Sequence, residues 1–402
     1  MYGLVLEGGG SKGSYQIGAC RALAEMGIVY GAVAGTSVGA LNGAMVVQGD
    51  IDKAYKLWHD MNPYDVIKMT DEELEGFSES SSRIESLNVF MRKLRKVIAE
   101  RGLDTAPLVE MLEKEIDEDR IRKSEMDFGI VTVDLTSRKA LEIYKEEIPN
   151  GRLVDYILAS ASFPAFRRAV IDGKVFIDGG FYNALPINLV KNKGCSDIIV
   201  LRTNSLGVKK RVDTAGLNIV TIEPSESLGP LLDFNPGRMR LNLKLGYFDA
   251  LKVFKKLRGS RYYIQPDNDD GFFISYLAGL EEDKVRGLCL LFGLDGGGRR
   301  ALFEYIVPRI ADLLSLPANA DYEDVFIGLL EKIAEANGIE RFRIYSAHEL
   351  YQEIEGSLCR YNEGFISEIP GFLKNRELLT RLVRDRIIRS IADIIFCTGV
   401  KG

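Results

Sequence analysis

A G-x-S-x-G pattern, the signature of a nucleophile elbow, is formed by Gly35, Ser37 and Gly39. In such an elbow the serine lies on a tight turn between a strand and a helix. Side chains two residues before and after it would collide, so both positions require glycine. Apolar residues at 28–34 predict the strand, and small apolar residues at 40–48 predict the helix. The pattern predicts Ser37 as a nucleophile at a helix N-terminus, which favours developing negative charge.

A second glycine-rich stretch, Gly8-Gly9-Gly10-Ser11-Lys12-Gly13, lies between a predicted strand at 2–6 and a predicted helix at 14–26. It satisfies the dinucleotide-binding pattern G-x-G-x-x-G. Such a site needs an acidic residue at the end of the second strand, where this chain has Thr36 and Ser37. A Walker A loop is excluded because the lysine is followed by glycine rather than by serine or threonine.

The other use of this stretch is an oxyanion hole, in which the amides of Gly8, Gly9 and Gly10 point at one oxygen. We favour the oxyanion hole over a non-catalytic nucleotide- or anion-binding turn, because two neighbouring strand–helix turns would place it beside Ser37. Lys12 either adds positive charge near the hole or is a solvated lysine of the first helical turn. The residues alone leave both roles open.

The base that would activate the serine is restricted by composition, since the chain has two histidines, His59 and His348. A triad in the order Ser, acid, His would use His348, which lies in a predicted helical region. His59 is typical of a surface or capping residue. Asp178 ends an apolar strand and precedes Gly179-Gly180, so its carboxylate is expected at the carboxyl edge of the sheet. Shielding from water would raise its pKa and make it a base, although its spacing fits a turn aspartate equally well.

Composition limits the classes of protein and partner. The chain has 402 residues, of which 46% are hydrophobic, and this length suits two or three domains. A net charge of -6 argues against nucleic acid as a main partner. The five cysteines form no CxxC pair, so we expect reduced thiols, with no metal and no cofactor. Neither a signal peptide nor a long apolar stretch is visible, which predicts a cytoplasmic protein and leaves peripheral contact at the inner membrane face open.

Periodicity predicts an α/β domain over 1–235 and a mainly helical C-terminal domain over 236–402. The first domain should have a mostly parallel sheet and a helical insertion at about 60–120. Within that insertion, acidic, serine-rich residues 70–86 are typical of an exposed connection. Further strands are expected at 128–135, 140–144, 175–178, 198–201 and 219–222, and insertion helices at 87–100 and 107–116, which form either a lid or a plain surface insertion. The C-terminal helices are expected at 241–257, 275–292, 302–314, 323–336 and 376–396.

Four blocks in this order resemble those of the patatin-like phospholipases. They are the stretch Gly8 to Gly13, the elbow around Ser37, residues 159–164 (Ala-Ser-Ala-Ser-Phe-Pro) and Asp178-Gly179-Gly180. The resemblance implies a three-layer α/β/α fold and hydrolysis of lipid acyl esters by a Ser37–Asp178 dyad without histidine. It further implies that the amides of Gly8, Gly9 and Gly10 hold the oxyanion, with Lys12, Gly13, Gly35, Gly39, Gly179 and Gly180 in support.

The resemblance covers about residues 1–201, and the substrate it implies is a phospholipid or lysophospholipid. Two positions depart from the family pattern, because Glu7 stands where the family usually has Asp and Lys12 where it usually has Arg. Both changes keep the charge. The helical remainder is similar to that of bacterial patatin-like proteins with an added C-terminal domain. Its residues 376–396 form a basic amphipathic helix that could lie on anionic lipid, although we favour packing against its own domain.

Overall fold

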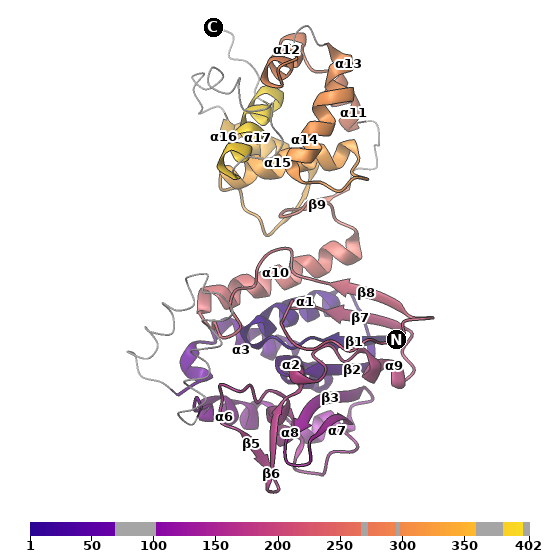
Figure 1. The fold of residues 1–402 in the computed structure, drawn as a ribbon, viewed down its shortest axis with the longest axis vertical. Helices are drawn as coiled ribbons and strands as arrows, with labels where there is room; N and C mark the ends of the chain where they lie inside the picture. The colour runs from indigo at the N-terminus through magenta and orange to yellow at the C-terminus, as the bar shows by residue number, and fades with distance from the viewer. Residues whose placement is uncertain (69–101, 267–271, 295–297, 359–380, 397–402) are drawn as a thin grey trace. The chain divides into compact units, whose positions relative to one another are not determined.

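The computed structural model of the chain describes residues 1–68, 102–266, 272–294, 298–358 and 381–396. Two compact units are formed, Met1–Val253 and Phe254–Gly402 (Figure 1). The predicted connection at 70–86 and the predicted insertion helix at 87–100 lie outside the described residues. The predicted helix at 107–116 is present as α6 (Ala106–Glu115).

Within the described residues, the first unit contains an eight-stranded sheet in the order β5-β6-β3-β2-β1-β7-β8, with β4 also paired to β3. The five strands from β3 to β8 in this order are parallel, whereas β4, β5 and β6 are antiparallel to their neighbours. The prediction of a mostly parallel sheet is confirmed. The strands are β1 (Tyr2–Leu6), β2 (Tyr30–Thr36), β3 (Asp127–Asp134), β4 (Lys139–Tyr144), β5 (Ala169–Ile171), β6 (Lys174–Asp178), β7 (Asp197–Leu201) and β8 (Asn218–Ile222).

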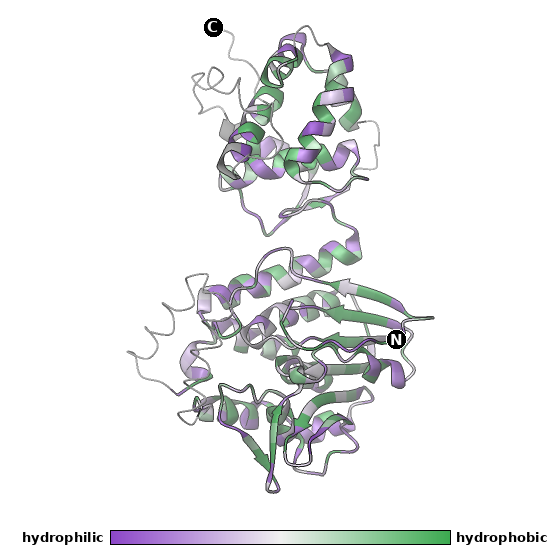
Figure 2. Ribbon diagram, viewed as in Figure 1, coloured by the Kyte–Doolittle hydropathy of each residue, from purple (hydrophilic) through white to green (hydrophobic). Residues whose placement is uncertain are grey.

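Helices cover both faces of this sheet, as the alternation of side chains along β1 shows. Val5 packs in a cluster with Leu189 of α9 (Ile187–Asn192). Leu6 points to the other face, where it lies under Gly43 of α2 (Val38–Gln48). The predicted three-layer α/β/α arrangement is therefore confirmed. Figure 2 shows the hydrophobic strands between these layers. The remaining helices of the unit are α1 (Gly13–Glu25), α3 (Ile51–Asp60), α7 (Glu118–Lys123), α8 (Leu153–Ser160) and α10 (Pro236–Lys255).

Helix α10 is held against α1 by two glycines that let the helix backbones touch. A Cβ at Gly18 of α1 would overlap the carbonyl oxygen of Leu243, and a Cβ at Gly246 of α10 would overlap that of Tyr15. Since α1 starts at the glycine-rich turn, this contact also fixes the turn. The predicted domain boundary at 235/236 falls before α10, whereas the first compact unit includes most of that helix.

The second unit is mainly helical and packs around one hydrophobic core. The predicted helix at 275–292 is two helices, because the chain turns at Gly279. A short parallel pair of strands, β9 and β10, was not predicted. The elements are β9 (Tyr263–Gln265), α11 (Phe272–Ala278), α12 (Glu282–Leu291), α13 (Arg299–Ala301), π-helix η4 (Leu302–Ile306), α14 (Val307–Leu314), α15 (Tyr322–Ala336), β10 (Ile344–Ser346), α16 (Ala347–Leu358) and α17 (Arg381–Phe396).

The basic amphipathic helix predicted at 376–396 is described as α17 from Arg381 onward. Its side chains Ile387, Ile391 and Ile395 are buried in the core of the second unit. The favoured prediction, packing against its own domain, is confirmed. None of the helices in the described ranges is long and apolar enough to cross a membrane.

The glycine contact between α1 and α10 can be tested with Gly246→Ala. Alanine normally stabilises a helix interior relative to glycine by about 1 kcal/mol. Here the overlap with the Tyr15 carbonyl should outweigh that gain and lower the free energy of unfolding of the first unit by about 2 kcal/mol. Trp58 is the single tryptophan, is buried, and donates its indole N–H to Asn42 at 2.9 Å, so its fluorescence during urea unfolding reports on this unit.

Gly287→Ala in α12 is the matched control, because a Cβ there would meet Ile394 at an ordinary 3.7 Å. It should leave the Trp58 transition unchanged. An unchanged or higher urea midpoint for Gly246→Ala would contradict the proposed close packing.

Candidate active site

Ser37 lies on the turn between β2 and α2 with a strained backbone, φ 57° and ψ −127°. A positive φ is uncommon for a residue with a side chain and persists only when its surroundings impose it. Two glycines make the turn sterically feasible. A Cβ at Gly35 would overlap the Gly39 carbonyl oxygen, and one at Gly39 would overlap the Leu6 carbonyl oxygen. The spacing of the G-x-S-x-G pattern is thus explained by close backbone contacts.

The structure brings the side chains of Ser37 and Asp178 together. The Ser37 hydroxyl donates to Oδ2 of Asp178 at 2.6 Å, and the Gly180 amide donates to Oδ1 at 2.7 Å. Sheet register explains this placement, because β3 pairs Val131 with Thr36 on one side and its next residue with Asp178 on the other. Strand β6 runs antiparallel to β3, so Asp178 does not reach this level as the end of a parallel strand. A short antiparallel strand ends at the height of the elbow instead.

Burial determines the protonation chemistry of Asp178, which is 5% exposed. Loss of hydration raises the pKa of Asp178 to about 6, while the hydrogen bonds from Ser37 and Gly180 oppose that rise. The carboxylate is therefore ionised at neutral pH but binds a proton more readily than an exposed aspartate. A carboxylate with this pKa, bonded to a hydroxyl, can act as a general base.

Ser160 fixes the backbone of Ser37, a role that the sequence analysis did not predict. Its hydroxyl accepts the backbone N–H of Ser37 at 2.9 Å and donates to the Val131 carbonyl at 2.6 Å. Asp178 is held in a similar way, since its backbone N–H donates to the Ser162 carbonyl at 2.9 Å. Residues 159–164 match a block of the family pattern, and that block is the signal from which these positioning roles could have been inferred.

The glycine-rich turn presents fewer open amides than the sequence predicted. The Gly8 amide donates to the Ala184 carbonyl at 3.1 Å, and the Ser11 amide donates to the Leu231 carbonyl at 2.9 Å. The amides of Gly9 and Gly10 have no hydrogen-bond partner among the described residues. The turn still adjoins Ser37, because a Cβ at Gly8 would lie 3.5 Å from the Ser37 Cβ.

Two charged residues frame this turn. Glu7 is fully buried, and its Oε2 accepts the backbone N–H groups of Thr203 at 2.6 Å and Asn204 at 3.0 Å. Its Oε1 lies 2.9 Å from the Lys209 ammonium. The Lys12 ammonium lies 3.5 Å from the Thr203 carbonyl oxygen. The pKa of Lys12 is lowered, because the effect of burial outweighs the opposing effect of the Glu7 charge. Glu7 therefore ties the turn to the segment after β7.

The other predicted glycines permit close approaches around the site. A Cβ at Gly13 would overlap the Val38 side chain, and one at Gly179 would overlap the Val131 carbonyl oxygen. A Cβ at Gly180 would lie 3.0 Å from the Asp178 carboxylate.

Neither histidine is hydrogen-bonded to the Ser37–Asp178 pair. His59 is half-buried and its Nδ1 lies 2.8 Å from Oδ1 of Asp60. His348 belongs to the second unit, where its Nε2 lies 2.9 Å from the Gln352 amide nitrogen. Among the residues that the structure describes, no three His, Cys, Asp or Glu side chains are grouped to hold a metal ion.

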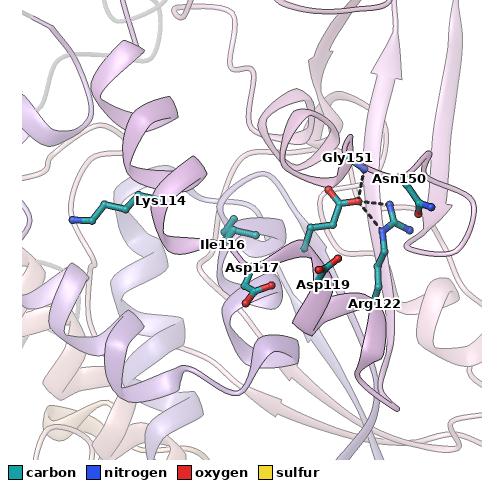
Figure 3. Close-up of a pocket in the computed structure, with 8 residues that line it drawn as sticks. Lys114, Ile116, Asp117, Asp119, Arg122, Asn150 and Gly151 are labelled. Carbon is teal, nitrogen blue, oxygen red and sulfur yellow. Dashed lines mark hydrogen bonds and ion pairs between the residues drawn. The ribbon is translucent and has the colours of Figure 1, made fainter.

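A surface hollow of about 690 Å³ lies apart from these residues. The Glu118 carboxylate beside it accepts hydrogen bonds from Arg122 and from the Gly151 amide, both at 2.7 Å (Figure 3). These two side chains thus fix the loop before α8, and we assign the hollow no function. Its lining residues are Lys114, Ile116, Asp117, Glu118, Asp119, Arg122, Asn150 and Gly151.

Comparison with known proteins agrees with the resemblance found in the sequence. The family model "Patatin-like phospholipase" matches residues 4–191, which include the elbow, the glycine-rich turn, Ser160 and Asp178. Patatin-like phospholipase domain-containing protein 7 of Rattus norvegicus is 24% identical over 205 residues, or 50% of this chain and 13% of the relative. Lysophospholipase NTE1 of Kluyveromyces lactis is 26% identical over 210 residues, or 51% of this chain and 13% of the relative. The predicted patatin-like phospholipase domain is confirmed over residues 4–191, and the aligned part spans 13% of the length of each of these relatives.

Among solved structures, VipD from Legionella pneumophila is similar with a TM-score of 0.39 and 14% sequence identity. The alignment covers 100% of this chain and 92% of that chain.

The raised pKa of Asp178 predicts how stability depends on pH. An aspartate with a folded-state pKa near 6 and an ordinary value of 3.8 destabilises the fold increasingly as pH rises through that interval. The free energy of unfolding of Asp178→Asn, relative to wild type, should therefore increase by about 2 kcal/mol between about pH 4 and pH 8. Urea unfolding followed by Trp58 fluorescence measures this difference.

Asp134→Asn is the control with the opposite sign. Asp134 is 3% exposed, and although burial raises its pKa, hydrogen bonds from Ser137 and Thr136 lower the pKa below its ordinary value. This variant should lose stability relative to wild type as pH rises. The relative free energy of unfolding of Asp178→Asn should neither stay constant with pH nor fall as that of Asp134→Asn does. Either result would contradict the conclusion that the ionised Asp178 carboxylate destabilises the fold.

Proposed function

We propose that this chain, whose residues 4–191 belong to the patatin-like phospholipase family, is a serine acylhydrolase that cleaves carboxyl esters of lipids. The observation that carries the proposal is the 2.6 Å hydrogen bond from the Ser37 hydroxyl to the buried Asp178 carboxylate. A serine needs a neighbouring base to become a nucleophile, and Asp178 is the titratable group bonded to it. No histidine takes part in the mechanism.

In the first half-reaction, the Ser37 oxygen attacks the ester carbonyl carbon while its proton passes to Oδ2 of Asp178. A tetrahedral intermediate forms, with negative charge on the former carbonyl oxygen. When it collapses, the bond to the leaving alcohol breaks and Asp178 returns its proton to the alcohol oxygen. The product is an acyl-Ser37 ester and a free alcohol or lysolipid.

In the second half-reaction, Asp178 takes a proton from a water molecule, whose oxygen attacks the acyl-Ser37 carbonyl carbon. Collapse of that intermediate releases the fatty acid and returns the proton to Ser37. The base thus acts twice and ends ionised. Its pKa of about 6 suits this role, because it is unprotonated at neutral pH and still able to accept a proton.

We assign the oxyanion to the amides of Gly9 and Gly10 rather than to all three predicted glycines. The Gly8 amide is bonded to Ala184, and the Ser37 amide is bonded to Ser160. The N-terminus of α2, which starts at Val38, adds the dipole of a helix end. Two open amides suit one oxygen and offer little to a pyrophosphate, which argues against nucleotide binding.

The substrate class is a phospholipid or a lysophospholipid. Support comes from the family match at residues 4–191 and from a relative that is itself named a lysophospholipase. Ser37 is only half-buried, so an ester from outside can reach its hydroxyl.

Substitution of the proposed dyad should abolish catalysis without unfolding the chain. Ser37→Ala and Asp178→Asn should each lower kcat for a p-nitrophenyl ester by about 10³-fold or more, because one removes the nucleophile and the other its base. A fluorophosphonate probe should label wild type at Ser37 and should not label Ser37→Ala. Circular dichroism checks that both variants stay folded.

His348→Ala separates the dyad from a histidine triad, and it should leave kcat unchanged. Loss of activity in His348→Ala, with Asp178→Asn still active, would establish the triad instead. Failure of the probe to label Ser37, together with a rise in melting temperature on adding NAD, would indicate a nucleotide-binding protein.

The pH dependence of hydrolysis should follow the titration of Asp178. Because the base must be unprotonated, kcat/KM should rise with pH through an inflection near 6 and then level off. Initial rates on a soluble ester between about pH 4 and pH 8 measure the profile. The inflection should persist in His348→Ala, and an inflection that disappeared in that variant would belong to the histidine.

A further inference from the structure

Three large apolar side chains are exposed beside the proposed active site. Leu206 is 85% exposed, Val208 53% and Phe181 52%. Single exposed apolar residues are ordinary, but a group of them beside a site marks a surface that binds something. Phe181 comes directly after Gly180, whose amide bonds the Asp178 carboxylate.

Backbone hydrogen bonds join the two segments that carry these side chains. The Val208 amide donates to the Gly180 carbonyl at 2.9 Å, and the Val208 carbonyl accepts from the Ala184 amide at 2.6 Å. Gly207 packs so tightly that a Cβ there would overlap the Cβ of Ala184. The loop is thus fixed in place at Val208, next to the glycines that follow the proposed base.

The same loop concentrates positive charge in a chain whose net charge is -6. Residues 202–212 contain four basic residues, Arg202, Lys209, Lys210 and Arg211, and no acidic residue. Two of them are used inside the fold, because Arg202 and Lys209 lie 3.3 and 2.9 Å from the buried Glu7 carboxylate.

The other two basic residues remain available on the surface. Lys210 and Arg211 are exposed, and neither lies in an ion pair with a carboxylate of the described residues. The Lys210 ammonium lies 3.3 Å from the centre of the Tyr182 ring, which holds it beside Phe181.

We propose that Phe181, Leu206, Val208, Lys210 and Arg211 form a docking surface for an anionic lipid bilayer. The three apolar side chains would enter the interfacial region, and the two cations would contact lipid phosphates. Charge complementarity favours this occupant, since exposed cations beside apolar side chains match a negatively charged headgroup layer over acyl chains. The inference deepens the proposed function, on which it rests for the identity of the substrate.

Sedimentation of the full chain with vesicles tests the docking surface directly. Wild type should bind phosphatidylcholine vesicles that contain phosphatidylglycerol more tightly than pure phosphatidylcholine vesicles, and added salt should weaken the binding. The double variant Lys210→Gln/Arg211→Gln should bind the anionic vesicles about 25-fold more weakly. Leu206→Asn should bind them about tenfold more weakly.

Matched control variants come from segments away from the docking surface, namely the turn before β2 and the helices α6 and α7 before β3. Val29 is 62% exposed, so Val29→Asn is compared with a further docking variant, Val208→Asn, which should weaken binding to the anionic vesicles as Leu206→Asn does. Lys114→Gln/Lys123→Gln, two exposed lysines on α6 and α7, is compared with Lys210→Gln/Arg211→Gln. Both controls should keep wild-type vesicle affinity.

Activity on a soluble ester distinguishes failure of the docking surface from failure of the proposed function. The docking variants should hydrolyse a soluble p-nitrophenyl ester at the wild-type rate and lose activity on vesicle lipid. Ser37→Ala should bind vesicles normally and hydrolyse neither substrate. The docking surface is refuted if wild type does not bind the anionic vesicles, or if the docking variants bind them as tightly as wild type does. It is also refuted if the control variants lose as much binding as the docking variants. Self-association that Leu206→Asn abolishes, without vesicle binding, would likewise replace the lipid with a second copy of the chain.

Discussion

The hydrogen bond from Ser37 to Asp178 joins a strained backbone to a buried charge, and each partner lowers stability by itself. Positive-φ residues cost of order 1–3 kcal/mol, and a carboxylate that is 5% exposed has lost most of its hydration. The bond supplies the carboxylate with one of its two donors and gives the hydroxyl a fixed direction. Both partners persist because the sheet determines their positions. Strand β3 pairs with β2 on one side and with β6 on the other, so the elbow and the end of β6 share one register.

Backbone-to-backbone contact, rather than side-chain packing, supplies the precision of this arrangement. Gly35, Gly39 and Gly179 each face a carbonyl oxygen that a Cβ would overlap. Contacts of this kind leave little room for the elbow to shift relative to β1 and β3. The same device recurs at Gly18 and Gly246, where α10 lies on α1 and thereby supports the turn from which α1 starts. A hydroxyl and a carboxylate can be kept at hydrogen-bond distance because the surrounding chain segments touch.

Local patterns in the sequence predicted those features of the fold that depend on residues close together in the chain. The role of the glycines around Ser37 was predicted because the collisions that require glycine occur within one turn. Long-range partners could not be predicted from the residues alone: nothing near Gly8 indicates that its amide is bonded to Ala184, and the family block at 159–164 singles out Ser160 without indicating that its partner is the elbow. The direction of β6 could likewise not be predicted, because a short strand of this kind has the same sequence pattern in a parallel and in an antiparallel sheet. The boundary at 235/236 preceded α10 because that helix is recognisable as part of the first unit only through its contact with α1.

Ala184 connects the interior of the proposed site with its outer surface. Its carbonyl accepts from Gly8, the first glycine of the turn, and its amide donates to the carbonyl of Val208 in the exposed loop. The ion pair between Glu7 and Lys209 makes a second link between the same two segments. The loop around Val208 therefore cannot move far without disturbing the glycine-rich turn, which carries the open amides of Gly9 and Gly10. A lipid surface that met Val208 would rest on a rigid support. Contact with that surface would then orient an ester relative to the elbow as well as raise its local concentration, which is the advantage a fixed loop has over a mobile one.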